Sequence, residues 1–129
     1  MIAFGSGSRP KRYGGVVIPL DINGEPSPRV RHFDLTPLYD PLIGLLSAIN
    51  IEGAMIVADT LVLLNRGITG KSDNAVVRYR RRDLLALIDG RVSNVEPISI
   101  RRFPLGSIDG VDLGFTDGAP LPDGRWLFT

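Results

Sequence analysis

Two acidic residues open the two most similar segments of the sequence. Glu52-Gly53-Ala54 and Asp117-Gly118-Ala119 lie 65 residues apart, and each is followed by an apolar run, a turn and a second apolar run. If the segments are equivalent strands of neighbouring units, their carboxylates converge on one site. With backbone carbonyls they could bind a hard cation such as Ca²⁺, or act as general base and acid on a bound ester or phosphate. The structural alternative is that both carboxylates accept hydrogen bonds from backbone amides of the neighbouring unit.

Three further polar residues flank the segment 67–73, which is predicted to be a loop. Asn65 and Arg66 end one predicted strand, and Asn74 begins the next. Because both strand ends lie at the same rim of a hairpin, these three residues are the candidate ligand-binding residues. Arg66 could bind a carboxylate or phosphate through two parallel hydrogen bonds. An ion pair between Arg66 and Glu52 is the structural alternative.

Two segments are rich in basic residues. Gly5-Ser6-Gly7-Ser8, followed by Arg9, Lys11 and Arg12, resembles an anion-binding nest of backbone amides, with an ordinary rim loop as the alternative. A second basic stripe consists of Arg78, Arg80, Arg81, Arg82, Arg101 and Arg102. Few aromatic residues are interleaved with it and the net charge is only +1, so nucleic acid is not a predicted partner. The stripe is interpreted as a charged outer edge that discourages strand pairing.

Several classes of protein are disfavoured by what the sequence lacks. One histidine and no cysteine disfavour a zinc site, since these are its commonest ligands. A Gly-x-Ser-x-Gly nucleophile elbow does not occur, so serine hydrolase chemistry has no support. No apolar run approaches the roughly 18 residues of a membrane-spanning helix, and the start of the chain lacks the features of a secretory signal. A cytoplasmic protein without membrane contact is therefore predicted.

Fifteen glycines and ten prolines separate short apolar runs, which favours an all-β fold. Short helical turns are expected in two connecting segments, 36–46 and 83–90, the second ended by Gly90. Strands are predicted at about 52–58, 60–66, 74–80 and 97–103. Four consecutive antiparallel strands of this length fit one blade of a β-propeller.

A second internal similarity extends the blade pattern. Val16-Val17 matches Val76-Val77 at an offset of 60 residues, and repeats at this scale indicate repeated structural units. Residues 1–129 are therefore predicted to form a single partial β-propeller domain. Segment 3–35 is a partial blade, 50–104 a complete blade, and 113–129 the first strands of a third. A propeller closes into a ring, so we expect a fragment of a longer protein, with self-association of copies as the alternative.

Ordered motifs along almost the whole chain carry a family resemblance. They occupy residues 4–12, 50–54, 64–67, 74–77, 113–117 and 121–124. Together they resemble an uncharacterised bacterial β-propeller family, which is distantly similar to esterase-like phytase and strictosidine-synthase-like propellers. The resemblance implies a longer protein of about six blades and no established activity.

Two functions remain open. The first is a ligand-binding or scaffold module for a small-molecule or anionic ligand. The second is a metal-assisted propeller hydrolase of an ester, lactone or phosphate. It would use Glu52 and Asp117 around a divalent cation such as calcium.

Overall fold

The computed structural model describes residues 1–67 and 73–129, which form four small antiparallel sheets and a few short helices. The predicted all-β class and the short helical turns are confirmed. Most of the segment predicted to be a loop at 67–73 lies outside the described residues.

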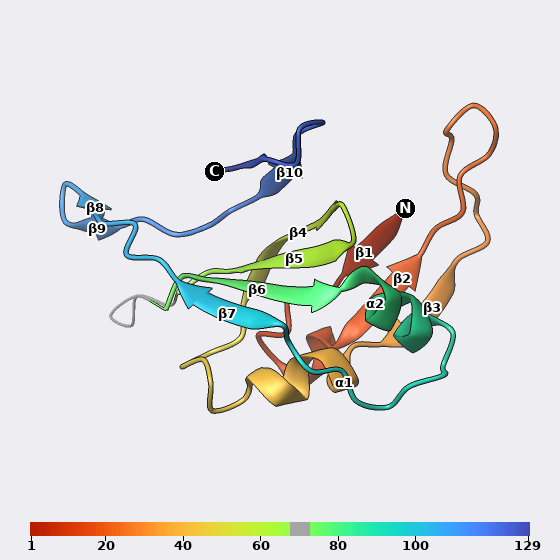
Figure 1. Cartoon of the computed structure of the whole chain (residues 1–129), viewed down its shortest axis with the longest axis horizontal. Coiled ribbons are helices and arrows are strands. Elements are labelled where there is room, and N and C mark those ends of the chain that lie inside the picture. The colour runs from red at the N-terminus through yellow and green to blue at the C-terminus, as the bar shows by residue number, and fades with distance from the viewer. Residues whose placement is uncertain (68–72) are drawn as a thin grey trace.

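The largest sheet contains four strands that pair in chain order (Figure 1). These are β4 (Ile51–Val57), β5 (Thr60–Asn65), β6 (Ala75–Arg80) and β7 (Ser99–Arg102). Each is antiparallel to the next. The four strands predicted within 50–104 are therefore present, each shifted by no more than two residues at either end.

The sheet β4–β7 is buried on both faces, which explains the almost uninterrupted apolar sequence of β5. One face presents Leu63, Val77 and Tyr79 to the main core. The opposite face presents Val62, Leu64 and Val76, together with Met55, to a second, smaller core. Alternate residues of β5 and β6 thus point into different cores, as the period of a strand requires.

The main core is closed by the N-terminal sheet and two helical segments. The sheet pairs β1 (Ile2–Phe4), β2 (Gly14–Val17) and β3 (Arg31–Asp34) in chain order, and the 3₁₀ turn η1 (Pro10–Arg12) joins β1 to β2. The helical turns α1 (Thr36–Tyr39) and η2 (Asp40–Leu42) occupy the segment where they were predicted. They contribute the fully buried Leu38, Tyr39 and Leu42.

Helix α2 (Arg81–Ile88) follows β6 without a connecting loop. Its buried Leu84 and Leu87 pack on the main core. Gly90, two residues beyond the helix, has φ +68°, a left-handed conformation that glycine adopts without a steric penalty and that ends helices. The predicted helical turn with its terminal glycine is confirmed.

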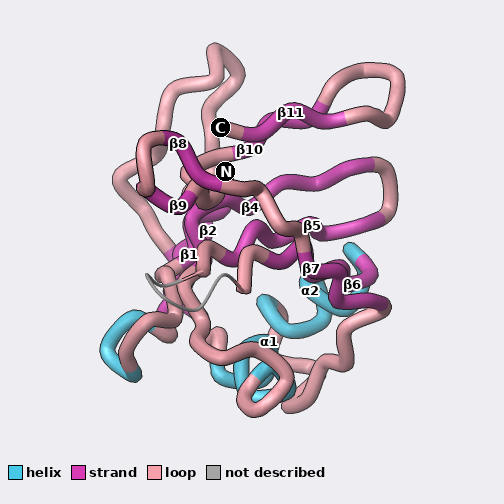
Figure 2. The backbone as a smooth tube through the Cα atoms, turned by 90° about the vertical axis from the view of Figure 1, so that its left-hand side faces the viewer, coloured by secondary structure: helices cyan, strands magenta, loops and turns pink. Residues whose placement is uncertain are grey.

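Two hairpins complete the chain. The first, β8 (Ser107–Ile108) with β9 (Val111–Asp112), was not predicted, although Asp109-Gly110 is a common two-residue hairpin turn. The second pairs β10 (Gly118–Pro120) with β11 (Trp126–Phe128). It lies over the β4–β5 hairpin, and the turns of both hairpins are on the same side (Figure 2). Phe115 and Trp126 join the second core between them.

Candidate functional site

Glu52 is the extra residue of a β-bulge in β4. Ile51 pairs with Asn65 and Gly53 pairs with Leu64, which leaves Glu52 without a partner on β5. A bulge of this kind changes the direction of one side chain, and Glu52 is exposed. Its Oε1 accepts a hydrogen bond of 2.9 Å from the Asn50 Nδ2. Among the residues that the structure describes, the carboxylate is thus held by a neighbouring side chain, whereas the structural alternative required a backbone amide of another unit.

Asp117 immediately precedes β10 and is also exposed. Its Oδ1 accepts a hydrogen bond of 2.6 Å from the backbone nitrogen of Gly118. Its backbone carbonyl accepts one of 3.1 Å from the Thr129 nitrogen, which extends the β10–β11 pairing. The residue borders a shallow hollow of about 220 Å³ that is otherwise lined by the ends of this hairpin.

The two acidic segments are neighbours in space, because Gly53 contacts the start of β10. A Cβ on Gly53 would lie 3.2 Å from the Gly118 nitrogen and 3.3 Å from the Asp117 carbonyl carbon. Within residues 1–67 and 73–129, no three acidic or histidine side chains gather as metal ligands. A cation bound by Glu52 and Asp117 would therefore take its other ligands from backbone carbonyls or amide side chains such as that of Asn50.

Asn65 is completely buried, and its side chain links two loop segments, one at 48–50 and one at Asp73. Its Oδ1 accepts a hydrogen bond of 2.7 Å from the Asn50 nitrogen, and its Nδ2 donates to the carbonyls of Ala48 and Asp73, both at 3.2 Å. Buried backbone groups need such partners. The side chain of Asn65 therefore has a structural role, and direct contact with a ligand stays a prediction.

Asn74, which immediately precedes the neighbouring strand β6, also links separate segments through its side-chain amide. Its Oδ1 accepts a hydrogen bond of 3.0 Å from the Gly67 nitrogen, and its Nδ2 donates one of 2.8 Å to the Leu113 carbonyl. Arg66 is exposed, and its side chain lies across Gly114 in the same chain segment as Leu113. Asn65, Arg66 and Asn74 do lie at one end of the sheet, as their positions predicted. In the described part of the chain, Arg66 forms no ion pair with Glu52.

The glycine-serine segment at 5–8 is folded back on its own loop. Gly5 and Gly7 donate their backbone N–H groups to the carbonyls of Gly14 and Arg12, at 2.9 and 3.1 Å. The Arg12 Nη1 donates to the hydroxyl oxygens of Ser6 and Ser8, at 3.4 and 3.2 Å. These internal hydrogen bonds favour the ordinary loop over the anion-binding nest.

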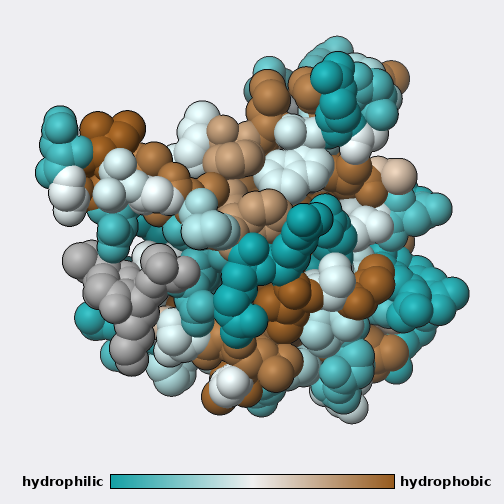
Figure 3. All heavy atoms as spheres, turned by 60° about the vertical axis from the view of Figure 1, so that its left-hand side comes forward, coloured by the Kyte–Doolittle hydropathy of each residue, from teal (hydrophilic) through white to brown (hydrophobic). Residues whose placement is uncertain are grey.

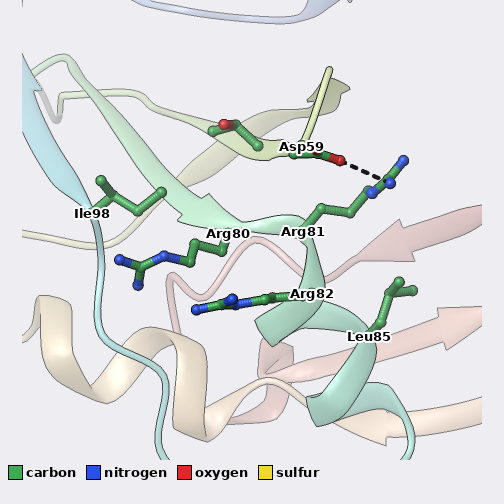
Figure 4. A pocket seen from close by; sticks show the side chains of 7 residues that line it. Asp59, Arg80, Arg81, Arg82, Leu85 and Ile98 are labelled. Carbon is green, nitrogen blue, oxygen red and sulfur yellow. Dashed lines mark ion pairs between the residues drawn. The ribbon is translucent and has the colours of Figure 1, made fainter.

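The basic stripe contains a hollow that the sequence alone did not predict. It has a volume of about 530 Å³ and lies where β6 passes into α2 (Figure 4). Its lining residues are Asp59, Thr60, Arg80, Arg81, Arg82, Leu85 and Ile98. Three consecutive arginines at the end of a predicted strand were the available signal, but only the tertiary structure brings Ile98 and Asp59 beside them.

Three ionisable groups with shifted pKa values belong to the framework. Burial raises the pKa of Tyr39 and of Tyr79 well above the ordinary range, so both hydroxyls remain donors. Tyr39 donates to the Gly5 carbonyl and Tyr79 to the Leu38 carbonyl, each at 2.6 Å. The backbone N–H of Ser47 is the main cause that lowers the pKa of Asp73, and Arg102 adds to the effect.

The sheets and short helices define a mostly β protein. The chain belongs to a family of unknown function, DUF6910, which matches it over residues 1–129. The expectation of an uncharacterised family is confirmed, whereas the resemblance to bacterial β-propellers stays a prediction. Searches of the curated proteins and of the solved structures found no match.

In the two described ranges, no helix has the length and apolar character needed to cross a bilayer. The predicted cytoplasmic location stays a prediction.

Proposed function

We propose that the chain is a section of a β-propeller that serves as a ligand-binding or scaffold module, with 3–35, 50–104 and 113–129 as parts of successive blades. The observation that carries the proposal is the stacking of the β10–β11 hairpin on the β4–β5 hairpin in the same orientation (Figure 2). Neighbouring propeller blades pack face to face through apolar side chains. The second core supports the proposal, because its Leu64, Val76 and Phe115 are buried together, as a blade interface would require.

In this arrangement β4 and β10 are the innermost strands of successive blades, and their first residues line the central channel. Glu52 and Asp117 would then face a small-molecule ligand or a divalent cation such as calcium. Asn65, Arg66 and Asn74 would shape the adjoining rim. The ring would be completed by further blades or by other copies of the chain.

A second candidate function is a metal-assisted hydrolase of an ester, lactone or phosphate. It is favoured by one observation, the contact of Gly53 with the Asp117-Gly118 backbone, which brings two exposed carboxylates onto neighbouring strands. One carboxylate would accept a proton from the attacking water, and the other, in its protonated form, would donate one to the leaving group. A bound cation would polarise the oxygen of the substrate.

Experiments with calcium and manganese would distinguish the binding module from the hydrolase. The melting temperature would be measured with and without each ion, and turnover would be followed with p-nitrophenyl acetate and p-nitrophenyl phosphate. A non-catalytic module is expected to release nitrophenol no faster than the same solution without protein. Metal-dependent turnover that Glu52→Gln and Asp117→Asn abolish, but Glu25→Gln does not, would establish the hydrolase instead. Glu25 is an exposed acid in the β2–β3 connection and so provides a matched control.

Self-association tests how the ring is completed. Sedimentation equilibrium over a hundredfold concentration range would reveal copies that assemble, because their average mass rises with concentration. A compact particle with the mass of one chain throughout would count against a ring completed by other copies and against the chain being a fragment of one.

A further inference from the structure

The hollow between β6 and α2 combines positive charge with exposed apolar surface. Of its lining residues three are arginines and one, Asp59, is acidic. Leu85 and Ile98 line it as well, and 46% and 49% of their surfaces are exposed. Surface arginines beside exposed aliphatic side chains are suited to a ligand that has an anionic group and an apolar part.

Asp59 neutralises only one of the three arginines. Arg81 is bound to the β4–β5 turn, because its Nη2 lies 2.9 Å from the Asp59 Oδ1 and its backbone nitrogen donates to the Asp59 carbonyl at 2.8 Å. This double link fixes the edge of the hollow. The guanidinium of Arg81 extends toward Asp59, away from those of Arg80 and Arg82 (Figure 4).

Arg80 and Arg82 extend in the same direction, on the side of the hollow where Ile98 lies (Figure 4). Both share one carboxylate, Asp83, at long range: Arg80 Nη1 lies 3.9 Å from Oδ2, and Arg82 Nε lies 3.6 Å from Oδ1. These distances exceed those of charge-assisted hydrogen bonds, which are about 2.7–2.9 Å. The side chains of Arg80 and Arg82 are also 54% and 79% exposed, so both guanidinium groups can bind an additional anion.

The position in the fold explains why the two arginines are accessible. Strand β7 pairs with β6 from Ala75 to Arg78, which leaves Arg80 beyond the last pair. On the other side Arg80 is paired with Thr60 of β5. The backbone is therefore fixed by the sheet, while the side chain extends over an unpaired edge. Because the sheet already fixes the backbone at Arg80, binding there costs little backbone conformational entropy, which favours association.

We propose that Arg80 and Arg82 form a binding site for a small oxyanion, a phosphate or a carboxylate, that carries an apolar group. The oxyanion lies between the two guanidinium groups, and the apolar group contacts Ile98, which lies on the same side of the hollow (Figure 4). The proposal gives the ligand-binding function a ligand class and a second location, separate from Glu52 and Asp117. The oxyanion site does not depend on metal binding or turnover at Glu52 and Asp117, so either proposal can fail without the other.

Phenyl phosphate, inorganic phosphate and benzoate are the probes. Isothermal titration would measure affinity, and methyl NMR spectra would locate binding through the signals of Ile98, with Leu85 on the opposite side of the hollow as the reference (Figure 4). Phenyl phosphate is expected to bind at least about tenfold more tightly than inorganic phosphate, because only phenyl phosphate buries an apolar surface. Whether phenyl phosphate or benzoate binds more tightly identifies the oxyanion. A higher salt concentration is expected to weaken the binding of phenyl phosphate and of benzoate.

The double variant Arg80→Gln/Arg82→Gln is expected to lower the affinity for the better probe by about tenfold or more, since charge-assisted hydrogen bonds are lost. Arg29→Gln/Arg91→Gln makes the same change of net charge at two exposed arginines outside the hollow and is expected to bind as the wild type does. Circular dichroism would verify that both variants fold. Absence of binding by all three probes at 10 mM, or equal losses in the two double variants, would overturn the proposal.

Discussion

Gly53 of β4 and Gly118 of β10 bring two sheets together backbone to backbone. A Cβ on Gly53 would lie 2.9 Å from the Leu64 Cδ1 and 3.2 Å from the Gly118 nitrogen. A Cβ on Gly118 would lie 2.7 Å from the same Leu64 atom and would also collide with Met55. Both glycines are therefore required for close approach and not for an unusual backbone conformation. This pair occupies equivalent positions of the internal repeat.

The glycine contact predicts a local effect of Gly118→Ala. We expect the added methyl group to push the β10–β11 hairpin away from β4 and to lower the free energy of unfolding by about 1–3 kcal/mol. Trp126, the sole tryptophan, lies on this hairpin and packs against the second core. Its fluorescence during urea unfolding therefore reports the change directly. Gly14→Ala is the control, because a Cβ there meets no atom within 4 Å, and equal destabilisation by both would contradict the packing argument.

Asn65→Asp tests whether the buried amide holds the loops. The substitution keeps an acceptor for the Asn50 nitrogen but replaces the donor to Ala48 and Asp73 with a second oxygen. A buried carboxylate facing two carbonyls is expected to cost about 3 kcal/mol or more in unfolding free energy. Chemical denaturation would measure it. Asn23→Asp, at an exposed turn, should change stability little, and a wild-type midpoint for Asn65→Asp would refute the assigned role.

Tyr79→Phe removes the only hydroxyl that links β6 to the carbonyl of Leu38. The carbonyl would be left buried without its partner, which is expected to lower the free energy of unfolding by about 1–3 kcal/mol. Guanidinium denaturation followed by circular dichroism provides the measurement. Tyr13→Phe is a suitable comparison, because the Tyr13 ring packs edge-on against Tyr39 and is unaffected by the loss of its hydroxyl. The prediction is wrong if the two variants lose the same stability.

The carboxylate of Asp73 makes the free energy of unfolding depend on pH in the acidic range. Its pKa in the folded state is lowered, chiefly by the Ser47 N–H and further by Arg102. The carboxylate therefore stabilises the fold above the unfolded-state pKa of about 3.9, and this stabilisation is lost as the pH falls through the lower folded-state value.

Asp73→Asn should accordingly lower the melting temperature at pH 7 and have a much smaller effect near pH 2. Differential scanning calorimetry across this range would test the expectation. Asp112→Asn, at an exposed position of β9, is expected to behave as the wild type at every pH. A constant difference between wild type and Asp73→Asn at all pH values would show that the role of Asp73 is not electrostatic.

The surface offers no continuous apolar face in the view of Figure 3. Apolar side chains interrupt the hydrophilic surface there in several separate patches. Among the exposed apolar residues, Ile108 and Val111 belong to the β8–β9 hairpin, and Leu127 and Phe128 to the β10–β11 hairpin.

The local sequence pattern was sufficient to predict the strands β4 to β7 and their order in the sheet. The alternation in 74–80 predicted that Ala75, Val77 and Tyr79 share one face, and these residues do enter one core. The terminating Gly90 was equally predictable, because its signal is confined to a few neighbouring residues. The Asp109-Gly110 hairpin carried the same kind of signal and was missed.

The roles of the polar residues depended on contacts between distant segments. The residues next to Asn65 and Asn74 in the sequence do not indicate where their side chains donate hydrogen bonds. Those acceptors are the carbonyls of Ala48 and Asp73 for Asn65, and that of Leu113 for Asn74. The bulge at Glu52 likewise follows from the register of β5 against β4.

The sequence by itself determined the all-β class, the four-strand order of β4–β7 and the likeness of the two acidic segments, because strand periodicity and turn chemistry act over a few residues. Only the tertiary structure decided that Gly53 meets Gly118 and that Arg80, Arg82 and Ile98 surround one hollow. Those relationships arise when separate sheets pack, and packing partners are set by shape and burial over the whole chain.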